Sequence, residues 1–344
     1  MLQYVKGLTL TTDCWTSSTA ENYLAVTAHF IDGEFVLRHV VLGCEVFGER
    51  HTSQNLAAAI KKIILEWNLE NKINIIISDN AANIKKAIQD ELRFKHFGCY
   101  AHTINLIAQD ALKPSLPVLS KVKDIVSYFR RSTHAANKLC EQQQNLEMEP
   151  TKRLIQEVPT RWNSTFYMVE RFVALEEAVR TTMALISHDL PVISMEEWDF
   201  LKELIIVLRP LEEITKTMSG ENYLTGSLVI ILTDGLTDVY RDLCDKQFKD
   251  MSKSIIKAVL HGIITRLGDL EGSNSLTLTT FLDPRFKNVA FSNDSVTDRV
   301  KHLLISSLTA NIKKNAPPLM NEENKDNGRI NPDVEEKKEP QPSI

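Results

Sequence analysis

The sequence predicts an α/β fold in which a mixed β-sheet is followed by a long all-helical region. Three observations support this prediction. Residues 7–47 contain three runs rich in Val, Ile, Thr and aromatic residues, a composition that favours strands. Residues 73–79 form a nearly continuous apolar run, which is typical of a strand buried beside helices. After residue 113, apolar residues recur mostly at helical spacing.

The first three strands are expected at residues 7–13, 23–31 and 34–47. The sequence IDGE between the second and third carries Asp-Gly, a strong hairpin signal, so the three strands should form an antiparallel meander. Residues 52–70 then show helical spacing of apolar side chains, with Thr52 or Ser53 as the N-cap.

The sheet domain continues with a strand at 73–79, a helix at 80–92 and a short strand at 94–99. The order is therefore βββ–α–β–α–β, with mixed strand directions. We place this domain at residues 1–112, because the sequence KPSLP at 113–117 breaks the chain.

An all-helical domain is expected at residues 113–314, followed by a tail at 315–344. The tail has no aromatic residue and carries four basic against seven acidic side chains, so it should be disordered. The candidate helices span residues 118–146, 161–186, 195–218, 225–246, 250–270 and 297–313.

The composition bounds the function. The formal net charge of −5 gives no global basic excess, so any nucleic-acid binding must be local. Five scattered cysteines favour a reducing compartment over a disulfide scaffold. The N-terminus lacks a secretory pattern, and no apolar run approaches the roughly 20 residues of a membrane span, so no membrane association is expected.

Two aspartates are the main candidates for chemistry. Asp13 should close the first strand and Asp79 the fourth, and these strands can be neighbours in a βββαβ sheet. Two carboxylates at corresponding strand ends would form a site for Mg²⁺ or Mn²⁺, as metal-dependent phosphoryl chemistry requires. The alternative is that each aspartate only caps a helix or forms a turn.

Two short motifs allow more than one interpretation. Cys99 and His102 in CYAH have the spacing of half a zinc site, but a buried Cys and a His near the sheet end would give the same pattern. Arg161 and Trp162 in PTRWNST begin a helix and could be either a structural anchor or a functional pair.

Residues 121–139 are the best local candidate for contact with nucleic-acid phosphates. This segment carries five basic side chains against one acidic, with two aromatic residues among them. A solvated helix face is the alternative. The basic residues are Lys121, Lys123, Arg130, Arg131 and Lys138.

Five motifs together resemble the hAT transposase superfamily, and more closely its domesticated branch, the zinc finger BED domain-containing proteins. They are TTDCWTS, IISDNAANI, CYAHTINLI, TRWNSTFYMVERF and FLDPRFKNVAF, and they extend the resemblance from about residue 8 to about residue 314. The resemblance implies a ribonuclease H-like core interrupted by a long all-helical insertion.

The resemblance also implies roles for individual residues. Asp13 and Asp79 match the first two of three metal-binding acidic residues. His102 matches a histidine close to the scissile phosphate. Arg161 and Trp162 match an active-site pair whose aromatic ring stacks on an unpaired base.

The third acidic residue, a glutamate on a helix after the insertion, has no match. Every glutamate after residue 280 lies in the low-complexity tail. Glu170 or Glu197 from the helical region is the alternative. The BED finger and the C-terminal dimerisation segment also have no match. No cofactor is then expected to be required: Mg²⁺ or Mn²⁺ would bind only at a vestigial site, and zinc only in the missing finger.

We therefore expect a domesticated, catalytically inactive nuclear protein with a DNA-associated or transcription-regulatory role. This chain should bind DNA weakly and through phosphates. One alternative is a fragment of an active metal-dependent DNA transposase. Another is a scaffold that binds protein partners through its helical domain and does not bind DNA.

Overall fold

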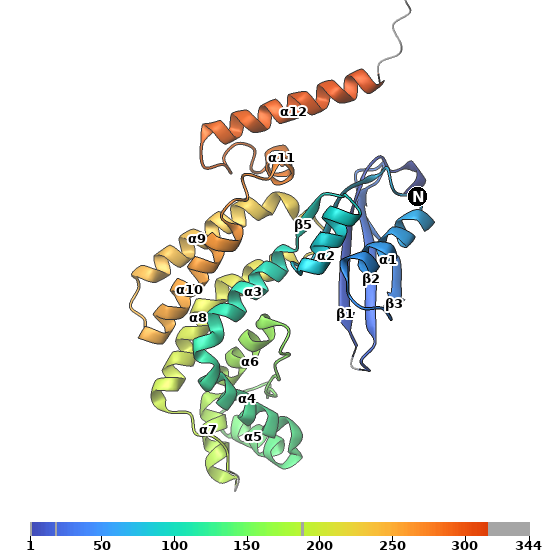
Figure 1. Cartoon of the computed structure of the whole chain (residues 1–344). Helices are drawn as coiled ribbons and strands as arrows, with labels where there is room; N and C mark the ends of the chain where they lie inside the picture. Colours follow the sequence, from blue (N-terminus) through green and yellow to red (C-terminus); the bar gives the residue numbers. More distant parts are fainter. Residues whose placement is uncertain (1, 18, 187–188, 316–344) are drawn as a thin grey trace, which may run out of the picture. The chain divides into compact units, whose positions relative to one another are not determined.

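The computed structural model describes residues 2–17, 19–186 and 189–315. Residues Met1–Val300 form one compact unit, and Lys301–Ile344 form another. The first unit holds the sheet and nearly all of the helices (Figure 1). Within the described residues, no helix combines the length and the apolar character needed to cross a membrane.

The sheet has five strands in the order β3-β2-β1-β4-β5. β1 pairs antiparallel with β2 and parallel with β4; β2 pairs antiparallel with β3, and β4 parallel with β5. The strands are β1 (Leu8–Thr16), β2 (Asn22–Ile31), β3 (Leu37–Val46), β4 (Ile73–Ser78) and β5 (His96–Gly98). This confirms the predicted α/β fold, the meander and the neighbouring positions of the first and fourth strands.

One face of the sheet builds a separate core with helix α1 (Ser53–Glu66). The alternation along β2 buries Leu24, Val26, Ala28 and Phe30 on that face. Thr52 is the N-cap of α1, as predicted, and its hydroxyl accepts a hydrogen bond from the Asn55 amide. The helix predicted at 80–92 consists of α2 (Ala82–Lys86) and one π-helical turn, Ala87–Glu91.

The helices between residues 100 and 282 share one continuous core. At its centre, Phe172 and Trp198 stack with ring centroids 4.8 Å apart. From residue 100 onward the helices are α3 (Tyr100–Leu112), α4 (Leu116–Arg131), α5 (Thr133–Asn145), α6 (Trp162–Ala174), α7 (Glu176–Leu185), α8 (Met195–Met218), α9 (Val229–Asp245), α10 (Asp250–Leu267), α11 (Asn274–Leu282) and α12 (Asp294–Asn315).

Two predicted helices are divided in the structure. The helix predicted at 118–146 breaks at Ser132, whose hydroxyl accepts a hydrogen bond from the Ala135 amide and so caps α5. The helix predicted at 161–186 breaks at Leu175. The sequence did not predict α11, since its Thr-rich pattern has a low helix propensity.

Helix α3 belongs to the helical core by its packing, although the predicted sheet domain extends to residue 112. Its apolar side chains join the same buried cluster as those of α8 and α10. Apart from Asn315 at the end of α12, the predicted tail at 315–344 lies outside the described residues.

Candidate functional site

Asp13 and Asp79 lie at matching distances along two neighbouring parallel strands, Asp13 within β1 and Asp79 just after the end of β4. β1 and β4 are paired as far as Thr11 and Ile77, and each aspartate lies two residues beyond that pair. Because neighbouring strands lie about 4.8 Å apart, this register brings the two aspartates near each other, and the charge of Asp79 acts on the Asp13 carboxyl group.

One detail of the prediction was wrong. Asp13 does not close its strand, because β1 continues to Thr16 and pairs with β2 over that stretch. β4 ends at Ser78, one residue before the predicted end at Asp79, so Asp13 lies where β1 extends beyond its parallel neighbour. Asp13 therefore has no β4 residue paired with it on that side of the strand.

Three other residues predicted from the sequence act on the Asp13 carboxyl group: Asp79, His102 and Arg161. Partial burial raises the pKa of its carboxyl group, and the negative charge of Asp79 raises it further. The amide of Cys14, His102 and Arg161 act in the opposite direction on this pKa. The neighbouring Cys14 thiol has a pKa raised to about 11, first by burial and then by the two aspartates.

Two helix N-termini supply the residues around the carboxylates. Cys99 is the N-cap of α3, which places His102 in the first turn of that helix. Arg161 is the N-cap of α6. The two helix starts are tied together because the backbone amide of Trp162 donates to Asn105 Oδ1 of α3 at 3.0 Å.

Asp79 also has a local structural role. Its Oδ1 accepts a hydrogen bond from the Ala81 amide at 3.1 Å, which shapes the turn into α2. The turn-forming interpretation of this aspartate therefore holds as well. It leaves the second carboxylate oxygen for another partner.

Trp162 does not lie where its predicted role would need it. Its side chain is 2% exposed and packs in the helical core, so in this structure an unpaired base has no access to the ring. The structure thus favours the anchor interpretation, although the indole Nε1 has no hydrogen-bond partner within the described part of the chain.

Sequence reasoning assigned no role to Trp15, which is 41% exposed. Its ring stacks on Tyr23 of the neighbouring strand, with centroids 5.4 Å apart and an interplanar angle of 12°. The signal was the two-residue spacing from Asp13, which places both side chains on one face of β1.

In the basic segment 121–139, Lys121 and Lys123 form ion pairs with glutamates, whereas among the described residues neither arginine of the segment pairs with a carboxylate. Lys121 Nζ binds Glu197 at 2.7 Å, and Lys123 Nζ binds Glu157 at 2.6 Å. These two lysines pair with carboxylates of the helical domain while staying partly exposed, so their contact with phosphates stays a prediction.

The two arginines of that segment remain exposed at the end of α4. Arg130 Nη1 donates to the Leu154 carbonyl at 3.5 Å, and Arg131 Nε donates to the Ser127 carbonyl at 3.2 Å. Both guanidinium groups keep most of their donors for another partner.

The two alternative glutamates have partners of their own. Glu170 pairs with Arg209 at 2.8 Å. Glu197 pairs with Lys121 and also forms a capping box with Ser194 at the start of α8. These contacts commit both carboxylates to helix packing.

Comparison with protein families gives two consecutive matches. The "ZBED1 RNase-like domain" matches residues 11–99, and the "ZBED1 RNase-like helical domain" matches residues 97–206. The chain belongs to the hAT transposase-derived proteins of the zinc finger BED type.

Curated relatives of this hAT-derived chain cover most of its length. "Putative AC transposase" of Zea mays is 28% identical over 81% of the chain. "Zinc finger BED domain-containing protein 4" of Homo sapiens is 26% identical over 87%, and "Zinc finger BED domain-containing protein 6" of Homo sapiens is 24% identical over 81%. The matches span only 36%, 26% and 30% of these relatives, so the chain corresponds to about a third of their length.

Proposed function

We propose that this chain is the core of a domesticated hAT transposase-derived nuclear protein that associates with DNA, takes part in transcription regulation and does not itself cleave DNA. The two family matches carry the proposal, and the position of Asp13 and Asp79 near His102 and Arg161 supports an inherited site in this chain. Relatives named as zinc finger BED domain-containing proteins and as "Putative transcriptional regulator tpeD" support the regulatory part.

We propose that the chain does not cleave DNA because of the number of metal-binding carboxylates that its described residues supply. Among the described residues, no group of three or more His, Cys, Asp or Glu side chains is arranged to hold a metal ion. Within the part of the chain that the structure describes, no third carboxylate joins Asp13 and Asp79. Loss of one catalytic group commonly costs orders of magnitude in rate.

The two carboxylates nevertheless fit a weakly bound divalent cation. Mg²⁺ is often held by one or two carboxylates, with water and substrate phosphates completing the shell. The charge of Asp79 raises the pKa of Asp13, and a bound cation would relieve that repulsion. When bound, the ion would neutralise charge at a phosphate, while Arg161 and His102 would position the same group.

Cleavage is tested with labelled duplex DNA in Mn²⁺. We expect no products from the wild-type chain and none from Asp79→Ala. Cleavage by the wild type that Asp79→Ala abolishes and Asp90→Ala preserves would overturn the proposal. Asp90 is a suitable control because it is an exposed acidic residue on the turn after α2.

The second candidate function is that of an active metal-dependent transposase core. It is favoured by the same observation that Asp13, Asp79, His102 and Arg161 still lie together. Titration calorimetry with MnCl₂ gives a further measurement. The vestigial site predicts weak heats that disappear in Asp79→Asn, whereas tight binding of two metal ions would favour the active core.

The scaffold alternative is favoured by the internal pairing of Lys121 and Lys123. A gel-shift assay at low salt separates it from DNA association. We expect weak binding that Arg130→Glu and Arg131→Glu reduce, with Lys257→Glu, an exposed lysine of α10, as the matched control. No shift at any protein concentration would leave the scaffold as the better account.

A further inference from the structure

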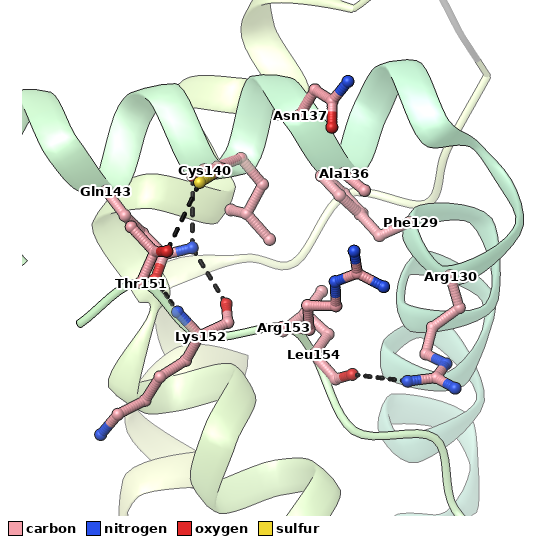
Figure 2. Close-up of a pocket in the computed structure, with 11 residues that line it drawn as sticks. Phe129, Arg130, Ala136, Asn137, Cys140, Gln143, Thr151, Lys152, Arg153 and Leu154 are labelled. Atoms are coloured by element: carbon pink, nitrogen blue, oxygen red, sulfur yellow. Dashed lines mark hydrogen bonds between the residues drawn. The ribbon is translucent and has the colours of Figure 1, made fainter. Parts of the chain in front are cut away.

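A cavity of about 310 Å³ opens between α4, α5 and the segment 151–154 (Figure 2). Its lining has an apolar part, formed by the buried side chains of Phe129, Leu139 and Leu154. Asn137 and Thr151 contribute polar groups. Small-ligand sites commonly occupy roughly 300–1,000 Å³ and combine an apolar wall with a few polar groups, so this cavity has the size and character of a small site.

The charged residues that line the cavity are all basic. They are Arg130, Lys152 and Arg153, and no Asp or Glu among the described residues lines it. Figure 2 shows the Arg153 guanidinium pointing into the space between α5 and Arg130, whereas the Lys152 side chain points away. Arg130 and Arg153 therefore both line the same cavity.

Both guanidinium groups are available to a ligand. The one hydrogen bond described for the Arg130 side chain is 3.5 Å long, which is at the outer limit for such a bond. Within the described part of the chain, the Arg153 side chain makes no hydrogen bond or ion pair. Among residues 2–17, 19–186 and 189–315, no carboxylate forms an ion pair with either arginine.

The backbone that carries Arg153 is held in place on both sides. Gln143 is 2% exposed; its Nε2 donates to the Lys152 carbonyl at 3.0 Å, and its Oε1 accepts from the Lys152 amide at 2.8 Å. Arg171 Nη1 donates to the Arg153 carbonyl at 2.9 Å. Such fixed backbone reduces the ordering cost of binding.

From this geometry we propose that the cavity binds a phosphomonoester, either of a free nucleotide or at the end of a nucleic-acid strand. A phosphomonoester carries about −1.5 to −2 charges at neutral pH, which two guanidinium groups match. The planar arginine fork pairs with phosphate oxygens through two parallel hydrogen bonds. A ligand with a single carboxylate carries one negative charge and would leave one of the two guanidinium charges unbalanced.

The apolar part of the lining gives a sugar or a base a surface to pack on, so the whole ligand is the size of one nucleotide. This site is separate from the Asp13–Asp79 pair. It goes beyond the proposed function, because binding of a free nucleotide would stand even if the chain bound no DNA.

Titration calorimetry with thymidine 5′-monophosphate tests the proposal, with thymidine as the ligand control. We expect saturable binding of one nucleotide per chain and none of thymidine. Arg153→Ala and Arg130→Ala should each weaken binding by about tenfold or more, as for other charged hydrogen bonds. Arg153→Lys should lose less than Arg153→Ala.

Arg180→Ala is the matched protein control, because Arg180 is an exposed arginine of α7 that pairs with Glu176 outside the cavity. Fluorescence anisotropy with a short thymidine oligonucleotide, with or without a 5′-phosphate, distinguishes the two sources. Tighter binding of the phosphorylated strand, lost in Arg153→Ala, assigns the site to strand ends; binding of the mononucleotide alone assigns it to free nucleotides.

Two results would overturn the proposal. One is nucleotide binding that is absent or unaffected by Arg130→Ala and Arg153→Ala. The other is equal binding of both oligonucleotides that these variants reduce equally, because that pattern belongs to backbone phosphodiesters. Both arginines are exposed, so their replacement should leave the fold intact.

Discussion

Replacing Lys123 with methionine should reduce the free energy of unfolding of the helical domain more than it reduces the free energy of DNA binding. Lys123 Nζ lies 2.6 Å from Glu157 Oε1, and the Glu157 side chain is only 6% exposed. Thr165 donates a second hydrogen bond to the same carboxylate at 3.1 Å. Methionine keeps the apolar stem of the lysine but leaves Glu157 without its cation.

The size of the effect follows from the burial of the two partners. Breaking a fully buried ion pair costs about 3–5 kcal/mol. Lys123 is 35% exposed, so water can reach part of the vacated space and we expect a loss of about 2–3 kcal/mol. Lys121→Met is the matched control. That pair is more exposed, at 38% and 19%, and its loss should cost under about 1 kcal/mol.

Urea unfolding followed by tryptophan fluorescence measures both variants, since Trp162 and Trp198 lie in the helical core. With a slope of about 2 kcal/mol per molar urea, Lys123→Met should lower the midpoint by roughly 1 M. The double variant Lys123→Met with Glu157→Gln should recover much of the loss, because no unpaired charge remains.

Two results would contradict the prediction for Lys123. If Lys123→Met left the midpoint unchanged and weakened DNA binding at low salt, Lys123 would be a surface phosphate contact. The buried ion pair would then contribute nothing measurable. Equal losses for Lys121→Met and Lys123→Met would also contradict the argument from burial.

Three further predictions follow from the site and the core. Asp13→Asn should raise stability at pH 7. The pKa of Asp13 is higher in the folded state than its ordinary value, so ionisation of this carboxyl group lowers the stability of the fold as the pH rises above the ordinary pKa. A lower thermal midpoint for the variant at pH 7 would contradict this. Ser194→Ala should cost about 1 kcal/mol in urea unfolding, because it removes the capping box of α8. Trp162→Ala should cost about 3–5 kcal/mol as a core replacement, whereas Trp15→Ala, at a 41% exposed position, should cost far less. Similar losses for the two tryptophans would show that Trp162 is not a core residue.

Much of the sheet could be predicted because its signals are local. Strand propensity, the Asp-Gly turn and the apolar run at 73–79 predicted β1 to β4, and the strand order that places Asp13 beside Asp79 was confirmed. The exact end of β1 could not be predicted. It depends on β2, which continues to pair with β1 beyond the end of β4.

In the helical domain, periodicity predicted the helices better than their ends. α8 has the predicted bounds, since Ser194 and Glu197 form a capping box that is visible in the sequence. The breaks at Ser132 and Leu175 were missed, because helical periodicity continues across both positions. Serine at an N-cap was the one local signal available for the first break.

The sequence alone thus determined the fold class, the family resemblance and the pairing of the two aspartates, because propensity, motif order and strand order are written along the chain. Only the tertiary structure decided which side chains are available. It buried Trp162, paired Lys123 with Glu157, and left Arg130 and Arg153 facing one cavity. The physical reason is that burial and ion pairing depend on partners from distant parts of the chain, which local patterns do not encode.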